Sequence, residues 1–292
     1  MPNNIAVVTG ANSGLGLVTA TELARRGDHV ILAVRNTAAG ERAAGEIRRA
    51  IPAARVEVRA LDLASLASVR AFAEGVQTLH LLVNNAGLVL LGPRQETADG
   101  FELHLGTNFL GHFALTGLLL DRLAGARPRI VNLSSITHKG KTLDFGDLMS
   151  VRDYNASRTY GRSKLATTIF GLELDRRLRA AGSPVISVLA HPGITRSNLT
   201  PRAWEHRGAL GRALSRAFLL LTQPVARGAQ PQLRAATASD VRGGQFFGPA
   251  GPGEIRGRST EVQPSRAAAD PATGRRLWTA AEELTGVRYL SD

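Results

Sequence analysis

The sequence predicts an α/β fold in which a doubly wound parallel sheet is covered by helices on both faces. Short runs rich in β-branched residues alternate along the chain with longer helical stretches. Because parallel strands need a long crossover connection, usually a helix, this alternation indicates a parallel sheet. A polar or glycine-bearing cluster also follows each of the first six runs. Ligands bind beyond the carboxyl ends of the strands in such sheets, so these clusters indicate a site there.

The expected elements follow one another without an internal repeat or a long linker before residue 190. The expected strands are residues 5–8, 29–34, 55–60, 80–84, 129–133, 185–190 and 245–247, and the expected helices are residues 14–26, 38–50, 65–76, 99–124, 158–181 and 271–285. We therefore expect a single domain over residues 1–292, in which a looser, basic segment at residues 195–230 forms a small substrate lid. Residues 245–292 are expected to add a C-terminal strand, a Pro/Gly-rich loop and the terminal helix.

The composition is ordinary for a soluble globular protein and excludes several kinds of site. Hydrophobic residues make up 43% of the chain and charged residues 21%, which suffices for a core. There is no cysteine, so the chain forms no disulfide and offers no thiolate to a metal or a substrate; we expect no metal. The first expected strand leaves no room for a signal peptide, and the apolar runs are far shorter than a membrane span. We expect a cytoplasmic protein with no membrane partner.

The net charge of +12 raises the question of nucleic-acid binding. The basic residues are spread along the whole chain and form neither a block nor a stripe interleaved with aromatic residues. Of the 36 basic residues, 33 are arginines, which together with abundant alanine and glycine indicates a compositional bias of the source. Charge alone supports only non-specific attraction, so we expect no nucleic-acid partner.

The segment Thr-Gly-Ala-Asn-Ser-Gly-Leu-Gly at residues 9–16 predicts a phosphate site. It follows an expected strand and precedes an expected helix, which is the context that a phosphate-binding turn requires. Glycines let the backbone turn tightly and approach a ligand, and the helix N-terminus points its N–H groups at the same place. A glycine-rich turn without a ligand is the alternative.

Further clusters follow the other expected strands at the same edge of the sheet. They are Arg35, Asp62, residues 84–87, Ser134 with Ser135, and residues 191–193. For His138 and His191 we favour structural roles with hydrogen bonds to the backbone.

Tyr160 and Lys164 are four residues apart on an expected helix, so their side chains share one face. A tyrosine has an ordinary pKa of about 10 and is a poor acid–base group at neutral pH. A nearby cation stabilises the phenolate and lowers that pKa towards the range in which general acid–base catalysis works best. The pair is therefore a candidate acid–base device, and an ordinary pair on a helix surface is the alternative.

Two further residues are candidate partners of this pair. Ser135, at the end of an expected strand, could hydrogen-bond a substrate oxygen, and Ser134 is the near alternative. Asn108 lies inside an apolar helical stretch, where asparagine is unfavourable unless its amide is used locally. A residue that merely kinks the helix is the alternative for Asn108.

With these residues on one chain, the sequence resembles a short-chain dehydrogenase/reductase over residues 5 to 197. The resemblance rests on residues 9–16, Asp62, residues 84–87, Asn108, Ser135, Tyr160, Lys164, Pro192 and Gly193. It implies a Rossmann-type fold, a nicotinamide cofactor, and hydride transfer to or from a carbonyl or alcohol carbon of a small molecule.

The resemblance also implies a role for each residue. Tyr160 exchanges the substrate proton, Lys164 lowers the pKa of Tyr160 and binds the nicotinamide ribose, and Ser135 polarises the substrate oxygen. Asn108 supports a water-linked proton path to Lys164. The implied cofactor contacts are Gly10, Asn12, Ser13, Gly14, Leu15, Gly16, Arg35, Asn36, Asp62, Leu63, Asn85, Ala86, Gly87, Tyr160, Lys164, Pro192, Gly193, Thr195 and Ser197.

A long insert between Ser135 and Tyr160 indicates which subgroup of this family the sequence resembles. It reads Leu-Asp-Phe-Gly-Asp-Leu at residues 143–148 and is followed by Tyr154. Together with the tail at residues 276–286, it is similar to the retinol-dehydrogenase-like and WW-domain-oxidoreductase-like members. We expect neither the membrane anchor nor the WW domain of those members here.

Arg35 and Asn36 indicate which nicotinamide cofactor is bound. An acidic residue after the second strand would favour NAD, because it accepts hydrogen bonds from the ribose 2′-hydroxyl and repels a 2′-phosphate. Here Arg35 takes that place, and a guanidinium suits a phosphate. We expect NADP(H); an arginine that only stacks on the adenine is the alternative.

The sequence leaves two alternative functions and the oligomeric state open. A non-catalytic NADP(H)-binding sensor or scaffold would share the fold, although it would be expected to lose Tyr160 or Lys164. A C=C reductase on the same fold is a further alternative. The resemblance also implies a homodimer or homotetramer formed through the long helices at residues 99–124 and 158–181, unless the C-terminal tail blocks that face.

Overall fold

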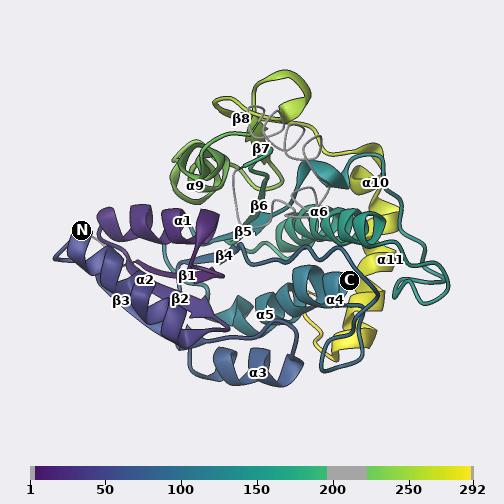
Figure 1. Cartoon of the computed structure of the whole chain (residues 1–292), viewed down its shortest axis with the longest axis horizontal. Coiled ribbons are helices and arrows are strands. Elements are labelled where there is room, and N and C mark those ends of the chain that lie inside the picture. The colour runs from purple at the N-terminus through teal and green to yellow at the C-terminus, as the bar shows by residue number, and fades with distance from the viewer. Residues whose placement is uncertain (1–3, 196–221, 291–292) are drawn as a thin grey trace, which may run out of the picture.

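The computed structural model describes residues 4–195 and 222–290. Its strands are β1 (Ile5–Thr9), β2 (His29–Val34), β3 (Arg55–Ala60), β4 (Leu81–Asn84), β5 (Arg129–Leu133), β6 (Ile186–Ala190), β7 (Phe246–Pro249) and β8 (Ser259–Glu261). They form one eight-stranded sheet in the order β3-β2-β1-β4-β5-β6-β7-β8 (Figure 1). The first seven strands pair in parallel, and β8 runs antiparallel to β7. The predicted doubly wound parallel sheet of Rossmann type is confirmed.

Helices cover both faces of the sheet (Figure 1). One face carries α1 (Gly14–Arg25), α2 (Thr37–Ala50), α8 (Val225–Gly228) and α9 (Gln230–Thr237), and the other carries α3 (Leu66–Glu74), α4 (Leu103–Leu105), α5 (Gly111–Leu119), α6 (Ala156–Ala180), α10 (Arg266–Ala269) and α11 (Pro271–Thr285). Each face has its own buried apolar cluster, because successive strand residues point to opposite sides. In β1, Val7 joins one cluster, whereas Ala6 and Val8 join the other.

Side-chain caps fix where several helices begin. Asn36 accepts a hydrogen bond from the Ala39 amide at the start of α2, and Asn155 caps α6 in the same way. Such caps satisfy backbone N–H groups that have no partner inside the helix. The short strands and the capped helices together place the carboxyl ends of β1, β4, β5 and β6 along one edge.

The helical stretch predicted over residues 99–124 is present but shorter and less regular, and covers residues 103–122. Glu102 accepts hydrogen bonds from the amides of His104 and Leu105, so the helix begins only at Leu103. It then widens into a π-helical turn at Gly106–Leu110 before α5, and it ends in a 3₁₀ turn at Leu120–Arg122. Such π turns recur at functional sites, and this one contains Asn108.

The C-terminal half also holds elements that the sequence did not predict, namely β8, α8, α9 and α10. The terminal helix α11 matches its predicted bounds, and β7 begins one residue later than expected. Most of the predicted lid lies outside the described residues, but both of its described flanks meet, since Thr195 and Gln223 form an isolated β-bridge.

The helix α11 packs across α6 and α5. Trp278 on α11 is buried, with its ring centroid 5.1 Å from that of Phe113 and 6.0 Å from that of Phe170. Tyr289 follows and donates a hydrogen bond to the Phe113 carbonyl. The C-terminal segment therefore covers part of the helical face through which the resemblance implied oligomer contacts.

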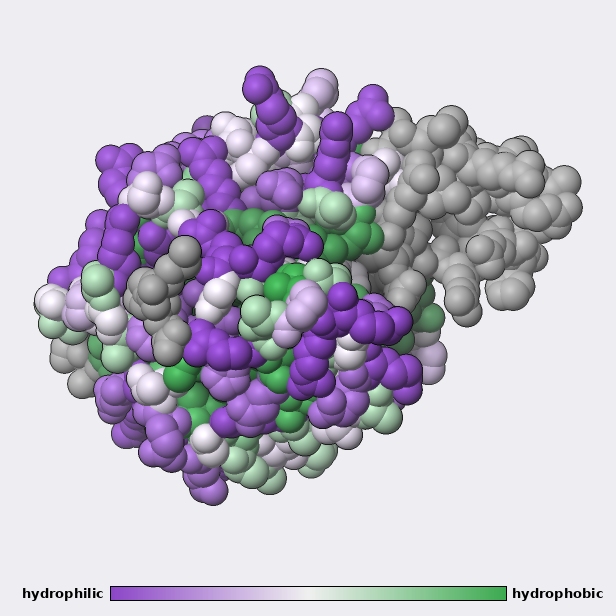
Figure 2. Space-filling view, turned by 90° about the vertical axis from the view of Figure 1, so that its left-hand side faces the viewer, coloured by the Kyte–Doolittle hydropathy of each residue, from purple (hydrophilic) through white to green (hydrophobic). Residues whose placement is uncertain are grey.

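The surface carries hydrophilic side chains over most of the face shown in Figure 2. Among the described residues, the large apolar side chains that remain exposed are Leu90, Leu91 and Val151. Within the same residues, no helix combines the length and the apolar character that a membrane span needs, and no His, Cys, Asp or Glu cluster could hold a metal.

Candidate active site

A cavity of about 680 Å³ opens at the carboxyl ends of β1, β4, β5 and β6. It lies where the strand order reverses between β1 and β4, the place at which open α/β sheets bind ligands. Its lining residues are Gly10, Asn12, Ser13, Gly14, Leu15, Gly16, Asn85, Ala86, Gly87, Leu88, Val89, Leu91, Leu133, Ser134, Ser135, Ile136, Thr137, Ser157, Tyr160, Lys164, Pro192, Gly193, Ile194, Thr195 and Val225. Most of the residues implied by the resemblance are thus gathered around one cavity.

The glycine-rich turn forms one wall of this cavity. Gly10 and Gly14 have φ of +66° and +58°, in the left-handed region that favours glycine. A Cβ on Gly16 would lie 2.4 Å from the Gly10 carbonyl oxygen, so a side chain does not fit there. The Ser13 side chain at the start of α1 makes no capping hydrogen bond. The N–H groups of the first helical turn therefore remain available to an anion.

Thr9 ties the glycine-rich turn to the loop after β4. Its hydroxyl oxygen accepts hydrogen bonds from the amides of Asn85 and Ala86, at 3.0 and 2.9 Å. The Asn85 side-chain amide donates in return to the Thr9 carbonyl, at 2.8 Å. Two walls of the cavity are therefore held at a fixed separation.

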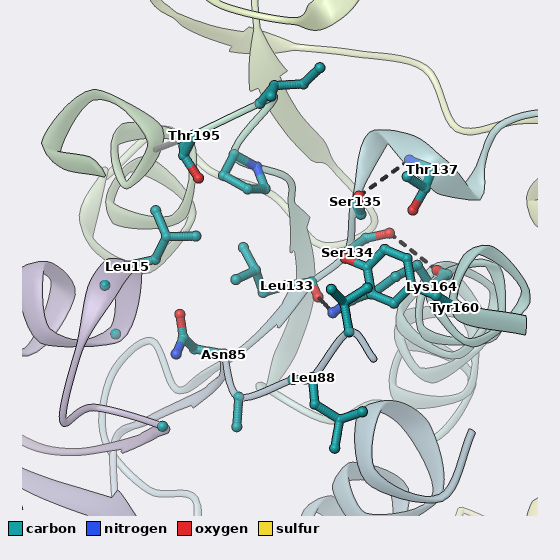
Figure 3. Close-up of a pocket in the computed structure, with 18 of the residues that line it drawn as sticks. Leu15, Asn85, Leu88, Leu133, Ser134, Ser135, Thr137, Tyr160, Lys164 and Thr195 are labelled. Carbon is teal, nitrogen blue, oxygen red and sulfur yellow. Dashed lines mark hydrogen bonds between the residues drawn. The ribbon is translucent and has the colours of Figure 1, made fainter. Parts of the chain in front are cut away.

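Lys164 lies at the floor of the cavity (Figure 3). Its side chain is only 5% exposed, and Nζ donates a hydrogen bond to the Leu133 carbonyl oxygen at 2.9 Å. Burial lowers the pKa of Lys164 to about 8. The amino group approaches the loop after β4 because Gly87 has no side chain: a Cβ there would lie 3.3 Å from Nζ.

Tyr160 and Ser135 both line the cavity (Figure 3). Burial raises the pKa of Tyr160, while hydrogen bonding to the hydroxyls of Ser135 and Thr137 lowers it, and the net change is a rise. The phenol is therefore protonated at neutral pH. The structure shows no lowering of this pKa by Lys164, the effect that the resemblance implied.

The two serines after β5 have different environments. Ser134 is buried, and its hydroxyl is engaged by the Lys164 carbonyl at 3.2 Å and the Thr168 hydroxyl at 2.7 Å. Ser135 lines the cavity beside Tyr160, and its Oγ accepts a hydrogen bond from the Thr137 amide. Of the two, Ser135 is placed to meet a ligand.

Asn108 lies behind the cavity rather than in its wall. Its Oδ1 accepts a hydrogen bond from the Leu88 amide at 2.8 Å, and its Nδ2 donates to the Leu88 carbonyl at 3.1 Å and to Ser163 at 3.0 Å. The Asn108 carbonyl accepts a hydrogen bond from the Thr167 hydroxyl at 3.2 Å. Asn108 thus fixes the loop after β4 against α6.

The loop after β6 closes the remaining side of the cavity with Pro192, Gly193 and Thr195. Gly193 has φ of +64°, and a Cβ on it would lie 2.2 Å from the Ile255 carbonyl oxygen. Ser197, the last of the implied cofactor contacts, lies outside the described residues.

Four other implied cofactor contacts do not line the cavity. Arg35 is exposed at the end of β2, and the Asn36 side chain caps α2. Asp62 accepts a hydrogen bond from the Ala64 amide within its own turn, and Leu63 is buried in the core. All four nevertheless follow β2 or β3, on the same edge of the sheet as the cavity.

The sequence also predicts that the substrate pocket is built from the residues after 193, the insert at residues 137–157 and the loop after Gly87, and most of the remaining lining residues lie in these segments. Thr137 is the first residue of that insert, and its side chain affects the pKa of Tyr160. Ser157 lies near the start of α6, three residues before Tyr160. The other lining residues in these segments are apolar, namely Leu88, Val89, Leu91, Ile194 and Val225, and the sequence missed Leu133 and Ile136, which lie beside Ser134 and Ser135.

Comparisons with known proteins agree with this architecture. The family model of the short chain dehydrogenases matches residues 4–208. Human retinol dehydrogenase 12 is 41% identical over 99% of this chain and 88% of its own length, and mouse polyprenol dehydrogenase is 41% identical over 98% and 84%.

A solved structure is also similar over nearly its whole length. The crystal structure of an uncharacterised protein from Mycobacterium paratuberculosis superimposes with a TM-score of 0.82 at 43% identity, covering 98% of this chain and 94% of that one. The family match, the full-length relatives and the shared fold lead to one conclusion: this chain belongs to the short-chain dehydrogenase family of oxidoreductases.

Proposed function

We propose that this protein is an NADP(H)-dependent oxidoreductase that interconverts a carbonyl and an alcohol on a small, apolar substrate, with Tyr160 as the general acid and base. The observation that carries the proposal is that Tyr160 and Ser135 line the same cavity as the glycine-rich turn, with the Ser135 side chain near enough to affect the pKa of the Tyr160 phenol. A proton donor, a second hydroxyl and a phosphate-binding turn thereby share one space.

The residues present fit a dinucleotide. The turn at residues 9–16 has open space at Gly14 in which a diphosphate could lie, since a Cβ there would meet nothing within 4 Å. The first turn of α1 contains no acidic residue, so its partial positive charge is not neutralised. Asn85, Ala86 and Gly87 would then line the cleft on one side, with Pro192 to Thr195 on the other.

In the reductive direction, Tyr160 donates its phenolic proton to the substrate oxygen while Ser135 donates a hydrogen bond to the same atom. A reduced nicotinamide would supply the hydride when bound. The protonated state of Tyr160 at neutral pH suits a donor. Lys164 holds a compact positive charge at the floor of the cavity, where it would bind the ribose. A water-linked proton path, supported by Asn108, would lead to Lys164 and return a proton to Tyr160. The oxidative direction reverses these transfers.

Arg35 supports NADP(H) over NAD(H). It stands exposed at the end of β2, with no acidic residue beside it in the chain. A guanidinium there provides a charge-assisted hydrogen bond to a 2′-phosphate.

The apolar lining supports an apolar substrate. Leu88, Val89 and Leu91 extend from the loop after β4 into the wall, and Leu91 is 51% exposed. Two of the similar proteins are named for retinol and polyprenol, which are apolar alcohols. We therefore assign aldehydes and ketones with extended apolar groups as the substrate class to test first.

The experiment that tests the proposal is the oxidation of NADPH, followed by its absorbance, with a panel of apolar aldehydes, ketones and enones. The expected result is turnover of at least one carbonyl compound, with the alcohol identified as product. An enone converted to the saturated ketone would instead favour the C=C reductase. Tight NADPH binding without turnover of any compound would favour the non-catalytic sensor.

The location and the assembly of the protein can be tested separately. We propose a cytoplasmic location, as the sequence predicts, and fractionation of the producing cells tests it. For assembly, the cover that α11 places over α5 and α6 supports a monomer over an oligomer built on that face. Light scattering decides between them, and a dimer that persists after the α11 surface is mutated would place the contact elsewhere.

A further inference from the structure

Glu254 is a half-buried carboxylate that joins two walls of the cavity without lining it. Its Oε2 lies 2.9 Å from Nε2 of His191, and its Oε1 lies 2.5 Å from Nζ of Lys139. The three residues come from distant parts of the chain. The proposed function assigns no role to any of them.

On one side, Glu254 fixes the orientation of the His191 ring. Nδ1 of His191 accepts a hydrogen bond from the Gly193 amide at 3.3 Å, so Nε2 carries the hydrogen and donates it to Glu254. His191 itself is fully buried, and burial lowers its pKa to about 4, which keeps the ring neutral. A Cβ on Gly248 would lie 2.2 Å from Nε2, so only glycine leaves room for this ring. The ring therefore transmits the position of Glu254 to the Gly193 amide.

On the other side, Glu254 holds the turn that begins at Ser135. This 3₁₀ turn spans Ile136–His138, and Lys139 is its C-terminal cap. His138 hydrogen-bonds the Ser135 carbonyl through Nδ1 at 2.7 Å, which makes the turn a compact unit. An ion pair at Lys139 therefore anchors the segment that carries the Ser135 hydroxyl.

The backbone at Glu254 is itself constrained. Glu254 has φ of +57°, a conformation that non-glycine residues seldom adopt and that surrounding contacts must maintain. The next residue, Ile255, accepts a hydrogen bond from the Ile194 amide at 2.9 Å. The loop that carries Glu254 is thus pressed against the loop after β6.

We infer that Glu254 is a positioning residue that sets the separation between the loop after β6 and the Ser135 turn. Its kinetic consequence rests on the proposed function, because those two segments would hold the nicotinamide carboxamide and the substrate oxygen. A carboxylate can accept from both His191 and Lys139 at once. A glutamine cannot, since its amide nitrogen is a donor and would face a second donor.

The test compares Glu254→Gln with Glu57→Gln. Glu57 is a matched control, because it also bridges a basic residue and a histidine, Arg59 at 2.6 Å and His29 at 3.7 Å, but it lies on β3. The first readout is the imidazole ¹⁵N–¹H spectrum of His191 in the full-length protein without cofactor. The second is NADPH affinity, and the third is kcat and KM for the best carbonyl substrate.

Glu254→Gln is expected to shift the His191 imidazole signals, to weaken NADPH binding several-fold, and to lower kcat by about 10-fold with a smaller change in KM, because displacements near 1 Å can cost about 100-fold. Glu57→Gln is expected to change none of these. Unchanged His191 signals, or kcat and NADPH affinity equal to those of the control, would overturn the inference.

Two further measurements keep the result decisive. If Glu254→Gln does not fold, Lys139→Met breaks the bridge at its exposed end, and an unchanged kcat in that variant overturns the inference. If the wild-type protein turns over no carbonyl compound, the proposed function fails, but the His191 spectrum still tests the bridge independently.

Discussion

Nζ of Lys164 donates a hydrogen bond to the Leu133 carbonyl oxygen, 2.9 Å away at the carboxyl end of β5. The lysine is thereby attached to the sheet rather than to a carboxylate. Burial of the charged amino group is unfavourable, and this burial lowers the pKa of Lys164 to about 8. Keeping a charged lysine in the cavity therefore lowers the free energy of unfolding of the protein.

This burial predicts a specific pH dependence of stability. The folded pKa lies below the ordinary value, so between about pH 8 and pH 10.5 the unfolded chain binds a proton that the folded protein has released. The free energy of unfolding of the wild type should therefore rise over that window relative to Lys164→Met, by about 3 kcal/mol in total. Urea denaturation of both proteins at several pH values measures the difference. A difference independent of pH would contradict the burial of this charge.

Gly16 should not tolerate even a methyl group. Its Cβ would lie 2.4 Å from the Gly10 carbonyl and 2.5 Å from Nδ2 of Asn85, both of which build the phosphate-binding wall. Gly16→Ala is expected to weaken NADPH binding by at least about 10-fold, the effect of losing one or two charge-assisted hydrogen bonds. Gly45→Ala is the control, since a Cβ there meets nothing within 4 Å and lies inside α2; it should stabilise the protein slightly. Equal NADPH affinity in the two variants would refute the role of this wall.

Arg35 should decide between the two nicotinamide cofactors. Arg35→Asp is expected to lower the ratio of NADPH to NADH affinity by about 10- to 100-fold, because a carboxylate repels a 2′-phosphate and accepts from a free ribose hydroxyl. Arg49→Asp makes the same charge change at the far end of α2 and should leave the ratio unchanged. Titrations with both cofactors measure it. An unaltered ratio in Arg35→Asp would mean that Arg35 only stacks on the adenine.

Trp278 should be the main anchor of the C-terminal helix. Its side chain is 2% exposed and packs against Phe113 and Tyr289, with Arg177 over its ring. Trp278→Ala is expected to cost about 3–5 kcal/mol of unfolding free energy. Val151→Ala, at a position that is 67% exposed, should change it by no more than about 0.5 kcal/mol. Chemical denaturation compares them, and similar midpoints would show that α11 contributes little to the core.

Local signals predicted the strands and the tail of the fold well. Strands β2, β3 and β5 have their predicted bounds, because β-branched runs there are flanked by clear breaks. The sequence could not predict β8, which has three residues and exists only through its pairing with β7. The π turn at Asn108 likewise depends on contacts with Leu88 and α6 rather than on local propensity.

The candidate site divides in the same way. Tyr160 and Lys164 could be found because their spacing places them on one helical face. Glu254 could not, since its partners His191 and Lys139 are 63 and 115 residues away in the chain. The roles of Tyr160, Lys164, Ser135 and Asn108 in catalysis stay predictions until they are measured.

Tyr160→Phe tests the central claim most directly, with Tyr154→Phe as the control on the insert before α6. If Tyr160 donates the substrate proton, the phenylalanine variant should bind NADPH as the wild type does, and its kcat for the best carbonyl substrate should fall by at least about 100-fold. Tyr154→Phe should keep both values. Carbonyl turnover in Tyr160→Phe at a rate near that of the wild type would contradict the proposed proton donor.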